Sequence, residues 1–174
     1  MSLKVFAERL REAGGTVSIH EGLGEAVSYI LDKLGGKTIL AVKTPPEAAR
    51  ILEEGGVQVI KPGSRHHLGF MEAEASIGFA DAGVAETGSI LYLTRYVWEE
   101  AAIFSPETHV SLLSSKDIHP GLEDLADKLH NALSRGLSAY LITGPSSTGD
   151  IEGEIIIGVH GSRVLHVAIY GGEE

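Results

Sequence analysis

The stretch TGPSSTGDIEG, residues 143–153, gathers hydroxyls, glycines and two acids between apolar runs. The apolar run before it is typical of a buried strand, and residues from about 148 could begin a helix. The free N–H groups of that helix would point into the loop beside Ser146, Ser147 and Thr148, where a phosphate or carboxylate could bind. The alternative is that these side chains only cap the helix and shape a polar turn. The loop is neither a Walker A motif nor a GxGxxG fingerprint.

A second stretch with acid chemistry is DAGVAETGSI, residues 81–90. Asp81 and Glu86 lie five residues apart on a glycine-bearing turn between two apolar runs. A carboxylate held in a partly dry cleft could act as a general base or a nucleophile. The alternative is that both are turn acids whose oxygens accept hydrogen bonds from nearby backbone.

A third stretch, GVHGSRVLH at residues 158–166, places His160 and Arg163 around a tight Gly-Ser turn. The pair could bind an anion or transfer a proton. Equally, the histidine could stabilise the last carbonyls of a helix that ends at Gly161. The adjacent His66 and His67 lack the i, i+4 spacing of metal ligands on a helix, and we expect no metal site.

Apolar runs and turn residues predict the elements that position these groups. Helices are expected after Ser2, over residues 23–34, after a Thr44 N-cap, within 65–75, over 122–133 and over about 150–159, where the β-rich run EIII leaves a strand as the alternative. Strands are expected at residues 16–20, 38–42, 57–60, 76–80, 89–93, 108–113, 138–143 and 164–170. The YVWEEAAIF segment is interpreted as a partly buried surface segment, and it could equally be part of a subunit interface.

Continuously apolar strands that alternate with helices indicate an α/β fold with a mostly parallel sheet flanked by helices. In such folds ligands bind at the carboxyl ends of the strands, so we expect the three stretches to lie there. The length of 174 residues and the absence of linkers or repeats predict a single domain, residues 1–174.

Composition excludes several classes of function. A net charge of -10, from 14 Lys and Arg against 24 Asp and Glu, argues against nucleic acid as a partner. The chain has no cysteine, so it cannot hold an iron–sulfur cluster through its own thiolates, form disulfides or use a cysteine nucleophile. No apolar run is long enough to suggest a membrane span, and the charged first helix is unlike a signal peptide. We therefore expect a cytoplasmic protein.

Two stretches together resemble the lactate-utilisation (LUD) domain family of the LutC/YkgG type. They are ADAGVAETGSILYL at residues 80–93 and ITGPSSTGDIEGEIIIGVHGSRVLHVAIY at residues 142–170. The resemblance implies a fold like that of the NagB/RpiA/CoA transferase proteins. It also implies a role in oxidising lactate to pyruvate beside partner subunits that carry iron–sulfur clusters.

By position, the resemblance makes Glu86 the candidate catalytic carboxylate, with His160 as a second catalytic candidate. The resemblance implies that Gly144, Ser146, Ser147, Thr148 and Gly149 form an anion-binding loop, and further candidates for binding a small anionic ligand are Thr87, Gly88, Asp150 and Arg163. The cofactor, the ligand and the oligomeric state are left open. So are two alternative functions: a stand-alone isomerase or transferase acting on a phosphorylated or CoA-linked substrate, and a non-catalytic assembly subunit.

Overall fold

The structure is a computed structural model that describes residues 2–35, 37–59, 73–149, 155–157 and 161–172. Within these residues the main sheet has six strands, each parallel to its neighbours, in the order β1-β12-β7-β4-β2-β3. The strands are β1 (Thr16–His20), β2 (Ile39–Val42), β3 (Gln58–Val59), β4 (Ala75–Phe79), β7 (Thr108–Ser114) and β12 (Val164–Tyr170). The predicted α/β fold with a mostly parallel sheet is confirmed.

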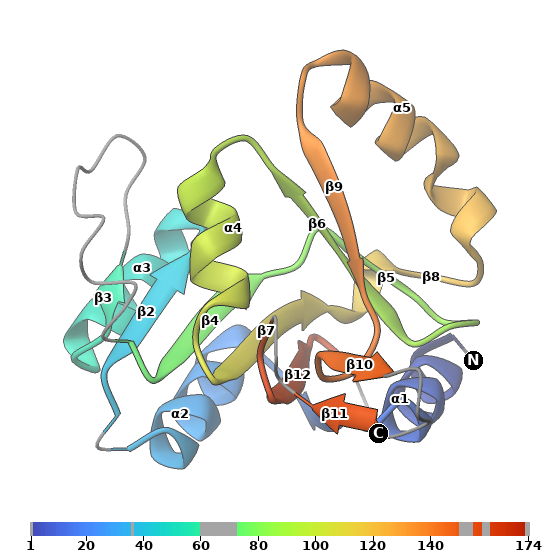
Figure 1. Ribbon diagram of the computed structural model, residues 1–174. Coiled ribbons are helices and arrows are strands. Elements are labelled where there is room, and N and C mark those ends of the chain that lie inside the picture. Colours follow the sequence, from blue (N-terminus) through green and yellow to red (C-terminus); the bar gives the residue numbers. More distant parts are fainter. Residues whose placement is uncertain (1, 36, 60–72, 150–154, 158–160, 173–174) are drawn as a thin grey trace.

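Helices cover both faces of this sheet (Figure 1). The helices α2 (Leu23–Lys33) and α3 (Pro46–Glu54) pack against one face, and α1 (Ser2–Glu12) and α4 (Val97–Phe104) pack against the other. Successive side chains of a strand point to opposite faces, so each strand contributes to two cores. No helix in the described part of the chain combines the length and apolar character needed to cross a lipid bilayer.

A second, smaller sheet packs against the side of the main sheet that α1 and α4 cover (Figure 1). Its strand order is β8-β5-β6-β9, with β6 antiparallel to both β5 and β9. The strands are β5 (Ala82–Val84), β6 (Ser89–Thr94), β8 (Ile118–His119) and β9 (Ser138–Ile142). The outer face of this sheet is covered by the 3-10 turn η3 (Leu122–Leu125) and by α5 (Ala126–Ser134). The 3-10 turn η2 (Ser115–Asp117) leads into β8.

The helix predicted over about residues 150–159 is wrong for the part that the structure describes. The strands β10 (Ser147–Gly149) and β11 (Ile155–Ile157) form an antiparallel hairpin. Three consecutive β-branched residues in β11 favour a strand, and this preference outweighs the helical spacing of the apolar residues. Residues 150–154 and 158–160 lie outside the described residues.

The segment interpreted as a partly buried surface segment forms α4. Two other predictions need correction. The N-cap of α3 is Pro45 rather than Thr44. The strand before the TGPSS loop is not buried: β9 is an edge strand whose Leu141 side chain is exposed. The short helix predicted within residues 65–75 lies mostly outside the described residues, and residue 75 begins β4. The remaining helices and strands fall within a few residues of their predicted positions.

Candidate functional site

The TGPSS loop lies at the amino ends of β7 and β12. The Ser146 N–H donates to the carbonyl oxygen of Ser162, two residues before β12, at 2.9 Å. The strand that precedes the loop, β9, belongs to the small sheet and not to the parallel one. The predicted position at the carboxyl ends of parallel strands is therefore wrong for this loop, although it holds for Asp81, which follows β4.

A cavity of about 330 Å³ lies against this loop. Gly144, Ser146 and Ser147, all predicted to bind ligand, contribute to its lining. The cavity is also lined by Thr143, Gly161, Ser162, His109 and Phe104, together with aliphatic side chains. Among the described lining residues there is no Lys, Arg, Asp or Glu, so the hydroxyls and the backbone supply most of the polar contacts.

His109 contributes to the cavity from a buried polar network. Its Nδ1 is 2.8 Å from Ser76 Oγ, and its Nε2 is 3.0 Å from the Tyr92 hydroxyl, which also lies 2.7 Å from Ser111 Oγ. Gly78 makes room for this network, because a Cβ there would lie 2.6 Å from the Tyr92 hydroxyl oxygen. Burial lowers the pKa of His109 to about 3 and raises the pKa of Tyr92. Both side chains are therefore uncharged at pH 7.

A chain of hydroxyls connects the ETG turn to the cavity. Thr87 Oγ1 lies 2.7 Å from Ser89 Oγ, which lies 2.5 Å from Thr143 Oγ1 in the cavity lining. Thr87 itself is exposed and does not line the cavity. Two of the predicted regions are thus joined, but only Thr143 and the residues after it face the cavity.

The Glu86 carboxylate makes a structural contact with the backbone. Its side chain is exposed, and Oε1 accepts a hydrogen bond of 2.8 Å from the backbone N–H of Leu122, the first residue of η3. The Glu86 N–H donates to the Pro120 carbonyl oxygen at 3.0 Å. Glu86 is not among the residues that line the cavity, so its carboxylate contacts η3 and not the TGPSS loop.

Gly88 and Gly144 both pack against the end of α1. Their φ angles are +67° and +74°, values that glycine adopts without strain. A Cβ on Gly88 would lie 2.3 Å from the Leu10 nitrogen, and one on Gly144 would lie 2.1 Å from the Ala13 carbonyl oxygen. Close contact with α1 therefore requires glycine at both positions.

The other predicted site residues are placed as follows. Arg163 is exposed, and its guanidinium lies 3.9 Å from a carboxylate oxygen of Glu107 outside the cavity lining. Thr148 and Gly149 form part of β10. Asp150 and His160 lie outside the described residues.

Sequence reasoning missed an ion pair at the carboxyl edge of the parallel sheet. Lys43, which follows β2, donates to a carboxylate oxygen of Asp81, after β4, and to the Leu93 carbonyl oxygen in β6. The same Asp81 oxygen accepts from the Leu93 N–H at 2.7 Å, so the contact ties the two sheets together. In the described residues Lys43 is alone among non-glycine residues in having a positive φ, 54°.

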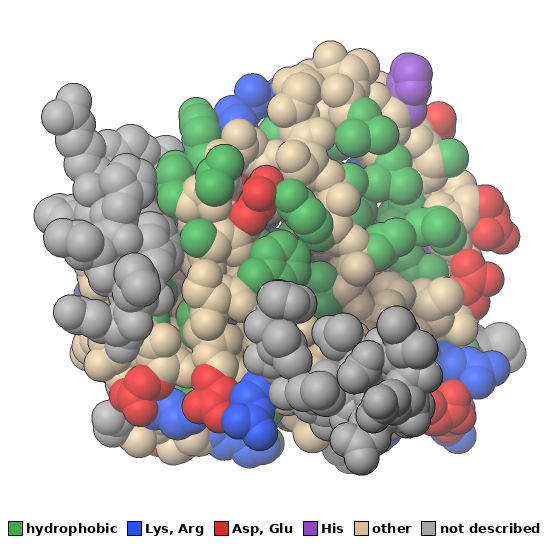
Figure 2. Space-filling view, viewed as in Figure 1, with side chains coloured by type: hydrophobic (Ala, Val, Ile, Leu, Met, Phe, Trp, Pro, Cys, Tyr) green, Lys and Arg blue, Asp and Glu red, His purple; other side chains and the backbone are tan. Residues whose placement is uncertain are grey.

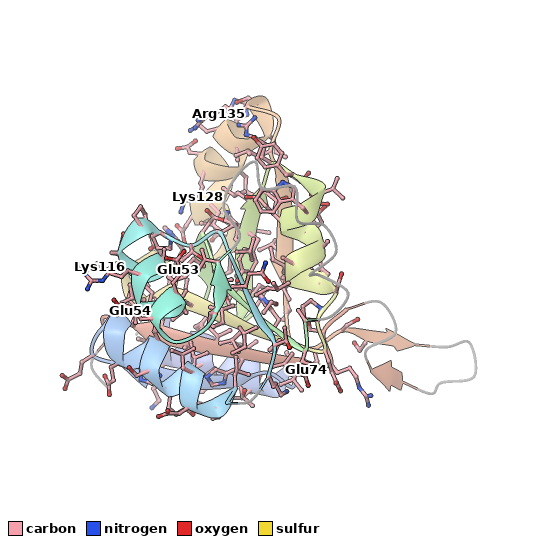
Figure 3. The ribbon with its side chains drawn as sticks, turned by 90° about the vertical axis from the view of Figure 1, so that its left-hand side faces the viewer. Glu53, Glu54, Glu74, Lys116, Lys128 and Arg135 are labelled. Atoms are coloured by element: carbon pink, nitrogen blue, oxygen red, sulfur yellow. The ribbon has the colours of Figure 1, made fainter. Side chains whose placement is uncertain are left out.

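Two further groups surround this ion pair. The Lys128 ammonium donates to the Asp81 carbonyl oxygen at 2.7 Å, and Figure 3 shows Lys128 between α5 and α3, whereas Arg135 lies at the outer end of α5. Thr44 Oγ1 is buried and has no hydrogen-bond partner within the described residues. The sequence pointed to this edge of the sheet only through Asp81 in its acidic turn. The residues around Lys43 do not indicate that it pairs with Asp81.

The comparison with protein families identifies the same family as the two sequence motifs. The model of the LUD domain matches residues 3–170, and the chain belongs to this family. The family resemblance seen in the sequence is thereby confirmed.

Curated relatives carry the LutC and YkgG names. Lactate utilization protein C of Geobacillus kaustophilus (strain HTA426) is 30% identical over 94 residues, which are 52% of this chain and 39% of the relative. The protein of the same name from Bacillus subtilis (strain 168) is 24% identical over 137 residues, 75% of this chain and 54% of the relative. YkgG of Escherichia coli (strain K12) is 31% identical over 94 residues, 52% of this chain and 41% of the relative. The matched parts thus span about half the length of these relatives.

A solved structure shows the same fold. The crystal structure of a DUF162 family protein from Deinococcus radiodurans has a TM-score of 0.74, with 98% of this chain and 96% of that chain covered. The two sequences are 19% identical, so the likeness concerns the fold alone.

Proposed function

We propose that this chain acts in lactate utilisation and binds a small hydroxy or keto carboxylate, such as lactate or pyruvate, in the cavity beside the TGPSS loop. The observation that supports this most directly is that Gly144, Ser146 and Ser147, chosen from the sequence, line one cavity in a LUD-family protein. The curated relatives named for lactate utilisation support the same role.

The lining would bind such a ligand through neutral donors. The hydroxyls of Thr143, Ser146 and Ser147 and nearby backbone N–H groups can donate to a carboxylate or to the hydroxyl of a hydroxy acid. His109 is uncharged at pH 7, so it can also contact a ligand without introducing a charge. The apolar wall that includes Phe104 suits the methyl group of a three-carbon acid. This arrangement supports binding and gives Glu86 no direct contact with the ligand.

Removing the hydroxyl of Ser146 tests this assignment. Ser146 makes no side-chain hydrogen bond to another described residue, so Ser146→Ala should preserve folding. Because a hydrogen bond to a charged group contributes about 1.5–3 kcal/mol, we expect binding of pyruvate or L-lactate to weaken by roughly tenfold or more in titration calorimetry. Ser134→Ala, at the exposed end of α5, is the matched control. Glu86→Gln should also keep its affinity, and a selective loss in Glu86→Gln would contradict the placement of the ligand.

We further propose that the chain works with iron–sulfur oxidoreductase subunits, since it has no cysteine with which to hold a cluster itself. An apolar part of the surface supports the presence of a protein partner. Figure 2 shows hydrophobic side chains gathered on the face formed by α4, β9 and α5. The exposed large apolar residues of these elements and of the α4 N-cap include Tyr96, Val97, Leu133 and Leu141, and Val97 is 79% exposed. Exposed apolar groups that gather on one face are typical of protein interfaces.

A charge placed in this apolar surface should disrupt assembly. We expect Val97→Asp to abolish co-purification with iron–sulfur subunits, while the melting temperature stays near that of the wild type. Val164→Asp is the matched control, because Val164 is an exposed valine on the opposite side of the main sheet. Equal recovery of partner subunits by the wild type and Val97→Asp would rule out this surface.

A further inference from the structure

A second cavity, of about 250 Å³, lies on the opposite face of the same two strands. His109 of β7 and Leu165 of β12 face the first cavity, whereas their neighbours Thr108, Val110 and His166 line the second. This is the alternation expected of β-strands, and it separates the two cavities by the thickness of the sheet. The second cavity is therefore independent of the site proposed above.

Two lysines give this cavity a positive charge in a chain whose net charge is -10. Lys33 is the last residue of α2 and Lys37 follows shortly after it, and both contribute to the lining. No Asp or Glu appears among the described lining residues, so neither ammonium has a carboxylate partner inside the cavity. The Lys33 ammonium lies 5.1 Å from the centre of the Tyr29 ring, which holds its side chain over α2.

Hydroxyl and imidazole groups form the polar floor of the cavity. Lys37 Nζ lies 3.4 Å from Thr108 Oγ1. His166 Nδ1 lies 2.8 Å from Thr16 Oγ1, and its Nε2 lies 2.9 Å from Ser18 Oγ, so the ring is fixed on both sides. Burial, together with the charges of Lys33 and His20, lowers the pKa of His166 to about 4. The positive charge available at pH 7 therefore comes from the two lysines.

The rest of the lining is aliphatic. Ile30 of α2 and its C-cap residue Leu34 line the cavity together with Val110 and Val164. An inorganic anion would leave these side chains without a partner, whereas an anion with a short hydrocarbon chain would contact both parts of the lining. Pockets for small organic molecules commonly combine an apolar lining with a few polar groups in this way.

We propose that this cavity binds a small organic anion with a short apolar chain, with its charged end at Lys33 and Lys37 and its chain against Ile30, Leu34 and Val110. The ligand class differs from that of the first cavity, where neutral hydroxyls rather than ammonium groups would hold the carboxylate. Simultaneous occupation is possible because the sheet lies between the two cavities.

The test uses acetate, butyrate and inorganic phosphate as probes on the 15N-labelled protein. We expect butyrate to shift the amide resonances of Lys33, Lys37 and Thr108 and to bind more tightly than acetate or phosphate. The Lys33→Gln/Lys37→Gln double variant should bind butyrate at least tenfold more weakly. The Lys4→Gln/Lys116→Gln variant removes two exposed lysines elsewhere, so it should bind butyrate like the wild type.

Three results would overturn the proposal: equal losses in the two double variants, stronger binding of phosphate than butyrate, or no shift at Lys33 and Lys37. The Ser146→Ala variant separates this proposal from the function proposed above. It should weaken pyruvate binding by roughly tenfold or more and leave butyrate binding unchanged, so failure at one cavity is visible without failure at the other.

Discussion

Gly144→Ala is expected to lower the free energy of unfolding by about 3 kcal/mol. Two costs combine at this position. The φ angle of +74° is strained for alanine by about 1–2 kcal/mol, and the new Cβ would lie 2.1 Å from the Ala13 carbonyl oxygen, so α1 or the loop must move. For a chain of this size the loss corresponds to a fall in melting temperature of roughly 8 °C.

Gly136→Ala is the control that separates these two costs. Gly136 has nearly the same φ, +73°, but a Cβ there meets no atom within 4 Å. We expect Gly136→Ala to lower the free energy of unfolding only by the cost of backbone strain, about 1 kcal/mol. Urea unfolding of both variants measures the difference. Equal losses would show that the contact between Gly144 and α1 is not as close as the structure has it.

Replacing His109 should have the second large effect. His109→Leu removes the partner of the Ser76 hydroxyl and one partner of the Tyr92 hydroxyl in a part of the core that is 0–1% exposed. Because buried groups without a partner are costly, we expect a loss of about 2–3 kcal/mol in the free energy of unfolding. His130→Leu, on the exposed side of α5, should change stability little.

The same variant has a pH signature. The pKa of His109 is about 3 in the folded chain and about 6.5 when unfolded, so the unfolded state binds more protons between these values. Stability that His109 provides is therefore complete above pH 6.5 and is lost as the pH falls, by at most about 1.4 kcal/mol per pH unit. His166 adds to this slope in the wild type and in the variant. Urea unfolding at pH 4.5 and 7.5 should give a smaller difference for His109→Leu, and an equal difference would contradict a buried, neutral His109.

Much of the fold could be predicted because its signals are local. The strand β2 is continuously apolar, and β4 and β12 are mostly apolar with one polar residue each, as expected for strands covered on both faces. Glycines mark the ends of several helices. The β10–β11 hairpin was missed because the sequence carries two conflicting signals. Three consecutive isoleucines favour a strand, whereas the wider spacing of the apolar residues favours a helix. Only pairing with residues 147–149 decides between them.

The candidate site was predicted in part for a similar reason. The TGPSS loop lines a cavity, but its position depends on which sheet contains β9. The local sequence does not indicate with which strand β9 pairs. Glu86 was singled out by its residue type, while its contact with Leu122 joins residues 36 positions apart. Lys43 and Asp81 are separated by 38 residues, and His109 by 33 from Ser76, so neither contact has a local signature.

The central claim is that the cavity beside the TGPSS loop binds a small carboxylate. The most direct measurement is a titration of the 15N-labelled protein with pyruvate and with L-lactate, followed through the amide resonances. We predict saturable shifts at Thr143, Gly144, Ser146 and Ser147, with smaller shifts at His109. In Ser146→Ala the same shifts should need roughly tenfold more acid or above. Shifts confined to Lys43 and Asp81, or to Lys33 and Lys37, would contradict the claim, as would a spectrum unchanged by millimolar amounts of either acid.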